Sequence, residues 1–185
     1  MQVSEDTFEL GKAIGQLLRG DARGAKALLV WNPEQLAQRL EIERLGGHID
    51  QLLRSVAADA YIGSAQEAAL APLVSAMQFD WIRREEALSQ LIKVFEENGI
   101  RAAFLKGIVW SDIVYQRPFD RSASDIDILI SERDALHFHQ VMQRAGYRYR
   151  DDKNTFASNE FAYHPRDDAY PFEIDVHWSL CDLYA

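Results

Sequence analysis

Two short acidic segments constrain the fold of this chain more than any other feature. Polar and apolar residues alternate over residues 124–130, where Asp125 and Asp127 are separated by one isoleucine. The same alternation returns over residues 173–178, which contain Asp175. Because successive side chains of a strand point to opposite faces, each segment predicts a strand with one acidic face and one apolar face. Strands of this kind suit a sheet that packs one face on a core and leaves the other open.

The acidic faces of these two strands are a candidate metal site. If the strands are neighbours, the carboxylates of Asp125, Asp127 and Asp175 converge. Carboxylates held that close together cannot all remain ionised without a cation, and Mg²⁺ takes oxygen ligands of this kind. His177 falls on the same face, and we expect it to hydrogen-bond a carboxylate there, because magnesium prefers oxygen to nitrogen.

A locally basic stretch precedes the first acidic strand. Residues 101–121 carry four basic and two acidic side chains, although the whole chain has a formal net charge of −9. This stretch is a reasonable place for a small polyphosphate. The candidate phosphate contacts are Lys106, Arg117 and Arg121, and Arg121 is favoured because a guanidinium binds phosphate in a forked geometry. Lys106 and Gly107 are expected to form a turn.

The pattern of apolar residues divides the chain into two regions. Residues 1–97 show helical spacing, with one long helix expected from about residue 72 to residue 97 and another that begins after Asn32 and ends at Gly46 and Gly47. Residues 98–185 alternate between strands and helices and then continue as three strands. The strands are expected at residues 100–105, 124–130, 147–150, 160–164 and 172–178. The predicted fold is therefore α+β, with a helical N-terminal half followed by a small mixed β-sheet with flanking helices.

Composition excludes several classes of function. The chain has no apolar run long enough to span a bilayer and no secretory signal at its start, so we expect a cytoplasmic protein without a membrane partner. The single cysteine, Cys181, cannot form an internal disulfide. The net acidity argues against a long nucleic acid duplex as a partner, because duplex binding needs a basic surface.

Several of these segments, taken in order, resemble one known family. They comprise Phe104, Leu105, Lys106, Gly107, Tyr115, Pro118, Arg121, residues 125–127, Gly146, Tyr147 and residues 173–178. The set is similar to the uncharacterised nucleotidyltransferase family of the DNA polymerase beta-like nucleotidyltransferase superfamily, over roughly residues 85–180. The resemblance implies a nucleotidyltransferase core in which Asp125, Asp127 and Asp175 bind metal and the turn at Gly107 approaches the phosphates of a nucleotide.

This chain departs from the superfamily pattern in two places. Many members carry Gly-Ser or Gly-Gly in the turn where this chain has Lys106 and Gly107, so the charge of Lys106 takes the place of a serine contact. Members of the family usually continue further, whereas this chain ends seven residues after Trp178. The comparison implies a truncated chain or a short relative, with an incomplete acceptor pocket.

Three interpretations of function follow. The first is a metal-dependent nucleotidyltransferase, with Asp125, Asp127 and Asp175 as catalytic residues and two Mg²⁺ ions, that moves a nucleoside monophosphate from a nucleoside triphosphate such as ATP to a hydroxyl group and releases pyrophosphate. The acceptor could be a small molecule, a protein or an RNA. The second is a non-catalytic, antitoxin-like or regulatory module that retains the fold and docks through its helical half. The third is a helical adaptor with a purely structural sheet, which leaves the aligned acidic faces unexplained.

Overall fold

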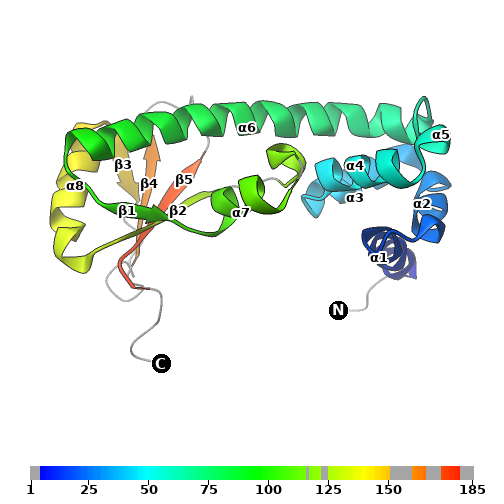
Figure 1. Cartoon of the computed structure of the whole chain (residues 1–185), viewed down its shortest axis with the longest axis horizontal. Helices are drawn as coiled ribbons and strands as arrows, with labels where there is room; N and C mark the ends of the chain where they lie inside the picture. Colours follow the sequence, from blue (N-terminus) through cyan, green and yellow to red (C-terminus); the bar gives the residue numbers. More distant parts are fainter. Residues whose placement is uncertain (1–4, 116, 122–124, 151–159, 166–171, 180–185) are drawn as a thin grey trace. The chain divides into compact units, whose positions relative to one another are not determined.

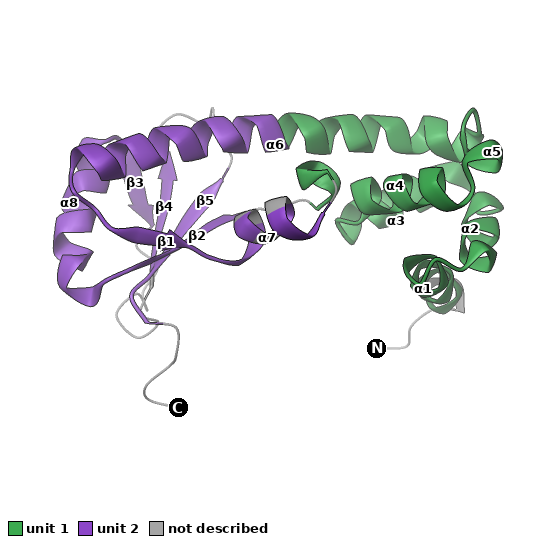
Figure 2. Cartoon of the chain, in the orientation of Figure 1, with its two compact units in different colours: residues 1–80, 116–122 green, residues 81–115, 123–185 purple. Residues whose placement is uncertain are grey.

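The computed structural model describes residues 5–115, 117–121, 125–150, 160–165 and 172–179. The chain forms two compact units, which Figure 2 distinguishes by colour. Unit 1 comprises residues 1–80 and 116–122, and unit 2 comprises residues 81–115 and 123–185. Among the helices of the described residues, none is both long and apolar enough to cross a membrane.

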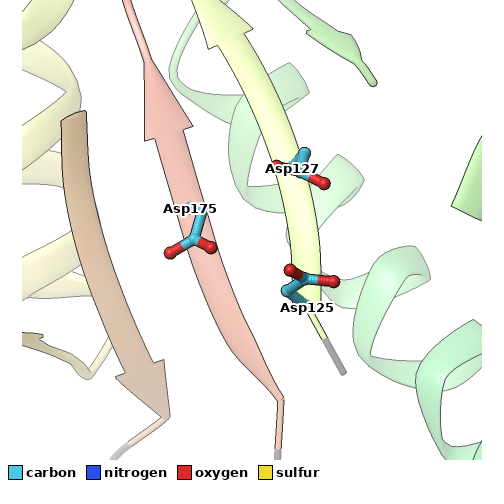
Figure 3. A group of neighbouring side chains, drawn as sticks. All are labelled: Asp125, Asp127 and Asp175. Carbon is cyan, nitrogen blue, oxygen red and sulfur yellow. The ribbon is translucent and has the colours of Figure 1, made fainter. Parts of the chain in front are cut away.

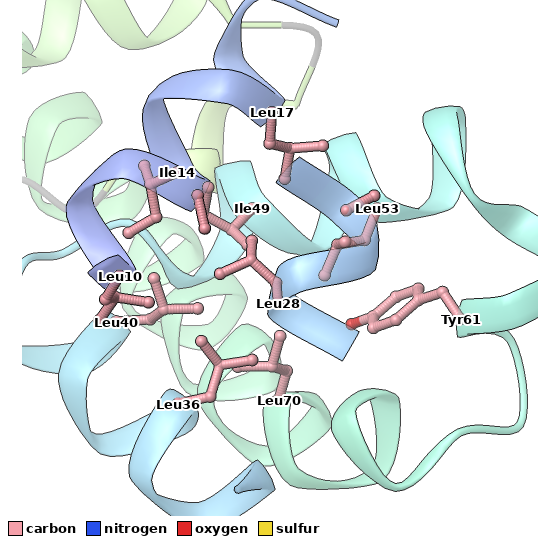
Figure 4. Close-up of a cluster of buried hydrophobic side chains, with 12 residues drawn as sticks. Leu10, Ile14, Leu17, Leu28, Leu36, Leu40, Ile49, Leu53, Tyr61 and Leu70 are labelled. Atoms are coloured by element: carbon pink, nitrogen blue, oxygen red, sulfur yellow. The ribbon is translucent and has the colours of Figure 1, made fainter. Parts of the chain in front are cut away.

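Unit 1 is built from helices around an aliphatic core. Its elements are α1 (Glu5–Leu18), α2 (Ala22–Leu29), α3 (Pro33–Ile42), α4 (Gly46–Val56), α5 (Ala58–Tyr61), the first part of α6 (Ala65–Glu97) and the 3-10 turn η1 (Pro118–Asp120). The longer helices bury residues at helical spacing, such as Leu36 and Leu40 of α3. The buried side chains in Figure 4 include Leu10, Ile14, Leu17, Leu28, Leu36, Leu40, Ile49, Leu53, Tyr61 and Leu70. The helical character expected for this part of the chain is confirmed.

The start of α3 agrees with the prediction from the sequence, whereas its end does not. The side chain of Asn32 accepts a hydrogen bond of 2.9 Å from the backbone N–H of Gln35, as expected for an N-cap. However, α3 ends at Ile42, and the prediction that it runs to Gly46 and Gly47 is wrong because these residues open α4. A Cβ on Gly47 would lie 2.8 Å from the Cα atom of Asp120, so this glycine serves close packing and not helix termination.

Helix α6 also differs from the sequence-based expectation. It begins at Ala65, before the expected start at residue 72, and contains Pro72 inside the helix. Its C-terminal end at Glu97 agrees with the prediction. A helix that began at residue 72 would hold this proline at its start, where a missing N–H costs nothing, but α6 contains it in the helix interior.

Unit 2 contains a five-stranded mixed sheet. Its elements after α6 are β1 (Ala102–Phe104), α7 (Lys106–Val114), β2 (Asp125–Ile130), the 3-10 turn η2 (Glu132–Asp134), α8 (Ala135–Arg144), β3 (Tyr147–Arg150), β4 (Glu160–Pro165) and β5 (Glu173–His177). The strand order is β1-β2-β5-β4-β3, in which β2 and β5 are parallel and the other neighbours are antiparallel. Figure 1 labels these strands along the chain. The predicted α+β fold, with a small mixed sheet and flanking helices, is confirmed.

One face of this sheet packs against helices. Ile126 and Ile128 of β2 and Val176 of β5 lie in a core with Phe138 of α8 and Phe95 of α6. The apolar positions predicted by the strand alternation are therefore the buried ones. The acidic positions of β2 and β5 belong to the opposite face.

The two regions expected from the sequence, residues 1–97 and residues 98–185, follow the change from helices to strands. The contact-based units follow other boundaries, since residues 81–97 join the sheet unit and residues 116–122 join the helical unit. The division of the chain into domains at residues 97 and 98 stays a prediction. Ser124 and Cys181 lie outside the described residues.

Candidate metal centre

Two adjacent parallel strands carry the three aspartates. Asp127 of β2 lies opposite Asp175 of β5. Asp125 is two residues before Asp127 and therefore on the same face of β2. One carboxylate oxygen from each aspartate lies within 4.8 Å of the others. Figure 3 shows the three side chains on neighbouring strands. The convergence expected from the alternating pattern is thus present, and the roles of these residues in metal binding and catalysis stay predictions.

The donor set fits a hard divalent cation. Mg²⁺ binds oxygen at about 2.1 Å in octahedral geometry, so two of its ligands lie about 3 Å apart when adjacent and about 4.2 Å apart when opposite. The carboxylate oxygens lie within 4.8 Å of one another, which is close to this range. The carboxylates of Asp125, Asp127 and Asp175 therefore suit a magnesium ion in both ligand chemistry and spacing.

Asp127 is the buried member of the group and has two basic neighbours. Its side chain is 7% exposed, and its Oδ1 atom lies 2.9 Å from the Nζ atom of Lys106. The Nε2 atom of His177 lies 3.2 Å from the same oxygen, as expected for a hydrogen-bond partner of a carboxylate. Lys106 thus places a positive charge on a carboxylate that would otherwise be surrounded by like charges.

Lys106 has an unusual backbone conformation. Its φ angle is +45°, in the left-handed region that favours glycine. A non-glycine residue there costs on the order of 1 kcal/mol, and such strain concentrates at functional sites. Tertiary contacts hold this segment in place, since the backbone N–H of Leu105 donates to the carbonyl oxygen of Asp127 at 2.9 Å.

The turn expected at Lys106 and Gly107 is the first turn of a helix. The sequence predicted a helix from residue 108, whereas α7 begins at Lys106. The hydroxyl of Ser111 donates to the carbonyl oxygen of Gly107 at 2.9 Å within this helix. Gly107 therefore lies at the N-terminal end of α7, where backbone N–H groups lack partners within the helix. Its proposed contact with phosphate stays a prediction.

The other two candidate phosphate ligands belong to unit 1. The guanidinium of Arg117 contacts Asp120 Oδ1 at 2.7 Å, Asp50 Oδ2 at 3.2 Å and the carbonyl oxygen of Gly47 at 2.8 Å. Arg117 thus helps to attach η1 to α4. Burial raises the pKa of Asp120, and the hydrogen bonds from Arg117 oppose this shift. Arg121 is exposed. The phosphate-binding roles of both arginines stay predictions.

The sequence reasoning missed a group of basic residues on the aspartate-bearing face. Arg148 and Arg150 of β3 are exposed, and Arg150 forms an ion pair with Glu173 of β5. His164 of β4 lies 3.7 Å from the same glutamate carboxylate. The alternation of tyrosine and arginine over β3 was the available signal, because it places both arginines on one face.

An α+β fold that gathers three carboxylates on one face of a mixed sheet is compatible with the binding of a divalent cation. Comparison with known families identifies the family of this chain. The family model described as "Uncharacterised nucleotidyltransferase" matches residues 32–185, and the chain belongs to this family. No curated protein and no solved structure shows significant similarity to the chain.

Proposed function

We propose that this protein is a metal-dependent nucleotidyltransferase that moves a nucleoside monophosphate from a nucleoside triphosphate, with ATP as the first candidate, to a hydroxyl group. The observation that carries the proposal is the meeting of three carboxylates from adjacent strands within 4.8 Å. Membership of a nucleotidyltransferase family supports the same reaction. A purely structural sheet would give no reason for three acids to converge on one face.

The proposed reaction exchanges one phosphorus–oxygen bond for another. The hydroxyl oxygen of the acceptor bonds to the α-phosphorus, and the bond between that phosphorus and the oxygen bridging to the β-phosphate breaks. Pyrophosphate leaves with the electron pair of the broken bond. Asp175, which is more exposed than Asp127, is the proposed acceptor of the hydroxyl proton.

Each residue of the site has a proposed part in this reaction. Asp125 and Asp127 would hold the ion that accompanies the nucleotide, and Asp175 would join them in holding a second ion. Bound divalent cations at such a site supply neutralisation of the pyrophosphate charge and a lower pKa for the attacking hydroxyl. Lys106 is proposed to leave Asp127 when a cation binds and to contact the triphosphate, which its exposed side chain favours. Gly107 offers its backbone N–H at the start of α7.

Isothermal titration of ATP with Mg²⁺ tests the proposal directly. We expect the wild-type protein to bind the nucleotide and Asp127→Asn to lose most of this affinity, because the substitution removes a metal-ligating charge and keeps the shape of the side chain. Glu132→Gln is the matched control, since Glu132 is an exposed acid of the same unit in η2. Equal affinities for wild type and Asp127→Asn would refute this site.

Release of pyrophosphate distinguishes the enzyme from the alternative module. Wild-type protein incubated with each nucleoside triphosphate and Mg²⁺ should release pyrophosphate or label itself, and Asp175→Asn should not. A protein that shows neither turnover nor metal-dependent nucleotide binding would instead be a non-catalytic interaction module.

A further inference from the structure

The face of the sheet that carries the aspartates continues onto β4 and β3 and changes its charge there. Asp175 of β5 lies opposite Ala162 of β4, which in turn lies opposite Arg150 of β3. Because Asp127 lies opposite Asp175, these four residues form one cross-strand row. The row therefore begins with two acids and ends with an arginine.

A second row beside the first has the same polarity. Asp125 lies opposite Glu173, and His164 lies opposite Arg148. Contact between His164 and the carboxylate of Glu173 at 3.7 Å connects the two halves of this row. Both rows thus run from an aspartate on β2 to an arginine on β3.

The basic end of the face is accessible and already holds an anionic group. The side chains of Arg150 and His164 are 47% and 41% exposed, and Arg148 is exposed as well. Glu173 places its carboxylate between Arg150 and His164, with a side chain that is 25% exposed. Side chains that gather around a carboxylate can also bind the oxygens of a phosphate.

Strand β4 separates the basic end from the candidate metal centre. Adjacent strands lie about 4.8 Å apart, so Arg150 on β3 starts about 10 Å from Asp175 on β5. Ala162 between them has only a methyl side chain and is 7% exposed. A ligand that displaces Glu173 from Arg150 and lies across β4 could contact Asp175 with one end and the arginines with the other.

We propose that Arg148, Arg150 and His164 bind a phosphate group of the acceptor, which makes the acceptor a phosphorylated hydroxyl compound. This inference rests on the proposed function. An in-line transfer needs the acceptor on the side opposite the leaving pyrophosphate. Lys106 and α7 adjoin β2, whereas the basic residues lie beyond β5 in the strand order. The triphosphate and the acceptor thus approach the aspartates from opposite sides.

The charge of the chain restricts the size of this contact. Two arginines and a histidine can bind one or two phosphates, and the net charge of −9 disfavours a longer anionic partner. Two sources of such a phosphate have the same chemistry. One is a small sugar phosphate, and the other is the end of an RNA strand.

Binding measured without metal tests the proposal apart from turnover. With EDTA present, ribose 5-phosphate and ribose are titrated by calorimetry, and a fluorescein-labelled hexaribonucleotide is followed by anisotropy. We expect wild type to bind at least one phosphorylated probe in preference to ribose, and the Arg148→Ala/Arg150→Ala variant to bind it about tenfold more weakly or worse. The probe that binds identifies the source of the phosphate.

Two further variants separate binding from structural effects. Glu173→Gln removes the carboxylate that occupies Arg150 and His164, so it should tighten probe binding. Arg144→Ala alters an exposed arginine of α8, whose buried residues pack on the opposite face, and should change nothing. Opposite effects of the glutamate and arginine substitutions would not arise from loss of structure.

The outcomes are distinct for the two proposals. Failure of wild type to bind either phosphorylated probe, or equal binding by wild type and the double arginine variant, overturns the acceptor proposal. Intact binding of ATP with Mg²⁺ by the same variants would then leave the proposed nucleotidyltransferase function standing. Absence of ATP binding with Mg²⁺ in wild type would overturn both the nucleotidyltransferase proposal and the acceptor proposal that rests on it.

Discussion

The contact between Lys106 and Asp127 predicts that substitution of the lysine changes the affinity for a metal ion and the affinity for ATP with metal in opposite directions. The lysine Nζ atom lies 2.9 Å from Asp127 Oδ1, so in the absence of a cation it offsets part of the charge of the three carboxylates. We expect Lys106→Gln to bind a divalent metal ion alone more tightly than wild type. The same variant should bind ATP with metal more weakly, because it lacks the charge proposed to contact the triphosphate.

The magnitude follows from the exposure of the lysine. Two unit charges 2.9 Å apart attract by about 1.4 kcal/mol in bulk water and by about 6 kcal/mol at an effective dielectric constant of about 20 near a protein surface. The lysine side chain is 65% exposed, so solvent screening reduces the net value to about 0.5–1 kcal/mol. Displacing the lysine therefore costs about two- to fivefold in metal affinity, and Lys106→Gln should recover that factor.

Electron paramagnetic resonance of free Mn²⁺, which takes similar oxygen ligands, measures the metal affinity without nucleotide. Calorimetry measures the affinity for ATP with Mg²⁺. Lys93→Gln is the control, because Lys93 is an exposed lysine of the same unit that pairs only weakly with Glu97 at 3.9 Å. Metal binding that is weaker in Lys106→Gln than in wild type would refute the reasoning.

Two further predictions concern the helical unit. Gly24→Ala should lower the free energy of unfolding by about 1–3 kcal/mol, because its Cβ would lie 2.4 Å from the backbone nitrogen of Leu17. Gly11→Ala lies in open space within α1 and should raise the free energy of unfolding by about 0.5–1 kcal/mol. Thermal melts of both variants check this prediction, and a shift of the melting temperature in the same direction for both would contradict it. Burial raises the pKa of Asp120, so the native state retains this proton to higher pH than the unfolded chain does, and stability falls as pH rises upward from the ordinary value of 3.8. Urea unfolding measured at several pH values above 3.8 should show that the free energy of unfolding falls less steeply with pH in Asp120→Asn than in wild type. The same pH dependence in the variant and in wild type would count against a raised pKa for Asp120.

The local sequence pattern was sufficient to predict most strand bounds in unit 2. The bounds of β3 agree with the prediction, those of β2 and β4 differ by one residue at one end, and those of β5 differ by one residue at each end, because period-two alternation is a property of neighbouring residues. The helix starts were less predictable. Lys106 opens α7 and Gly46 opens α4, since these positions depend on partners far away in the chain, such as Asp127 and Leu73.

The basic residues show the same limit for the site. The charge and position of Arg117 predict a phosphate contact, which stays a prediction, whereas the contacts of its guanidinium with Asp50 and Asp120 in unit 1 are visible only in the structure. Arg148 and Arg150 drew no attention, because nothing in the linear sequence places β3 two strands from β5. Charge is visible in a sequence, but the partner of a charge is a property of the packed chain.

The sequence by itself determined which face of each strand is acidic and which is apolar, because side-chain direction in a strand follows from backbone geometry alone. Only the tertiary structure decided that β2 and β5 are parallel neighbours with Asp127 opposite Asp175. Pairing of strands separated by more than forty residues depends on burying the apolar face against α6 and α8, and this burial involves the whole unit. The same packing that buries the isoleucines brings the three carboxylates together.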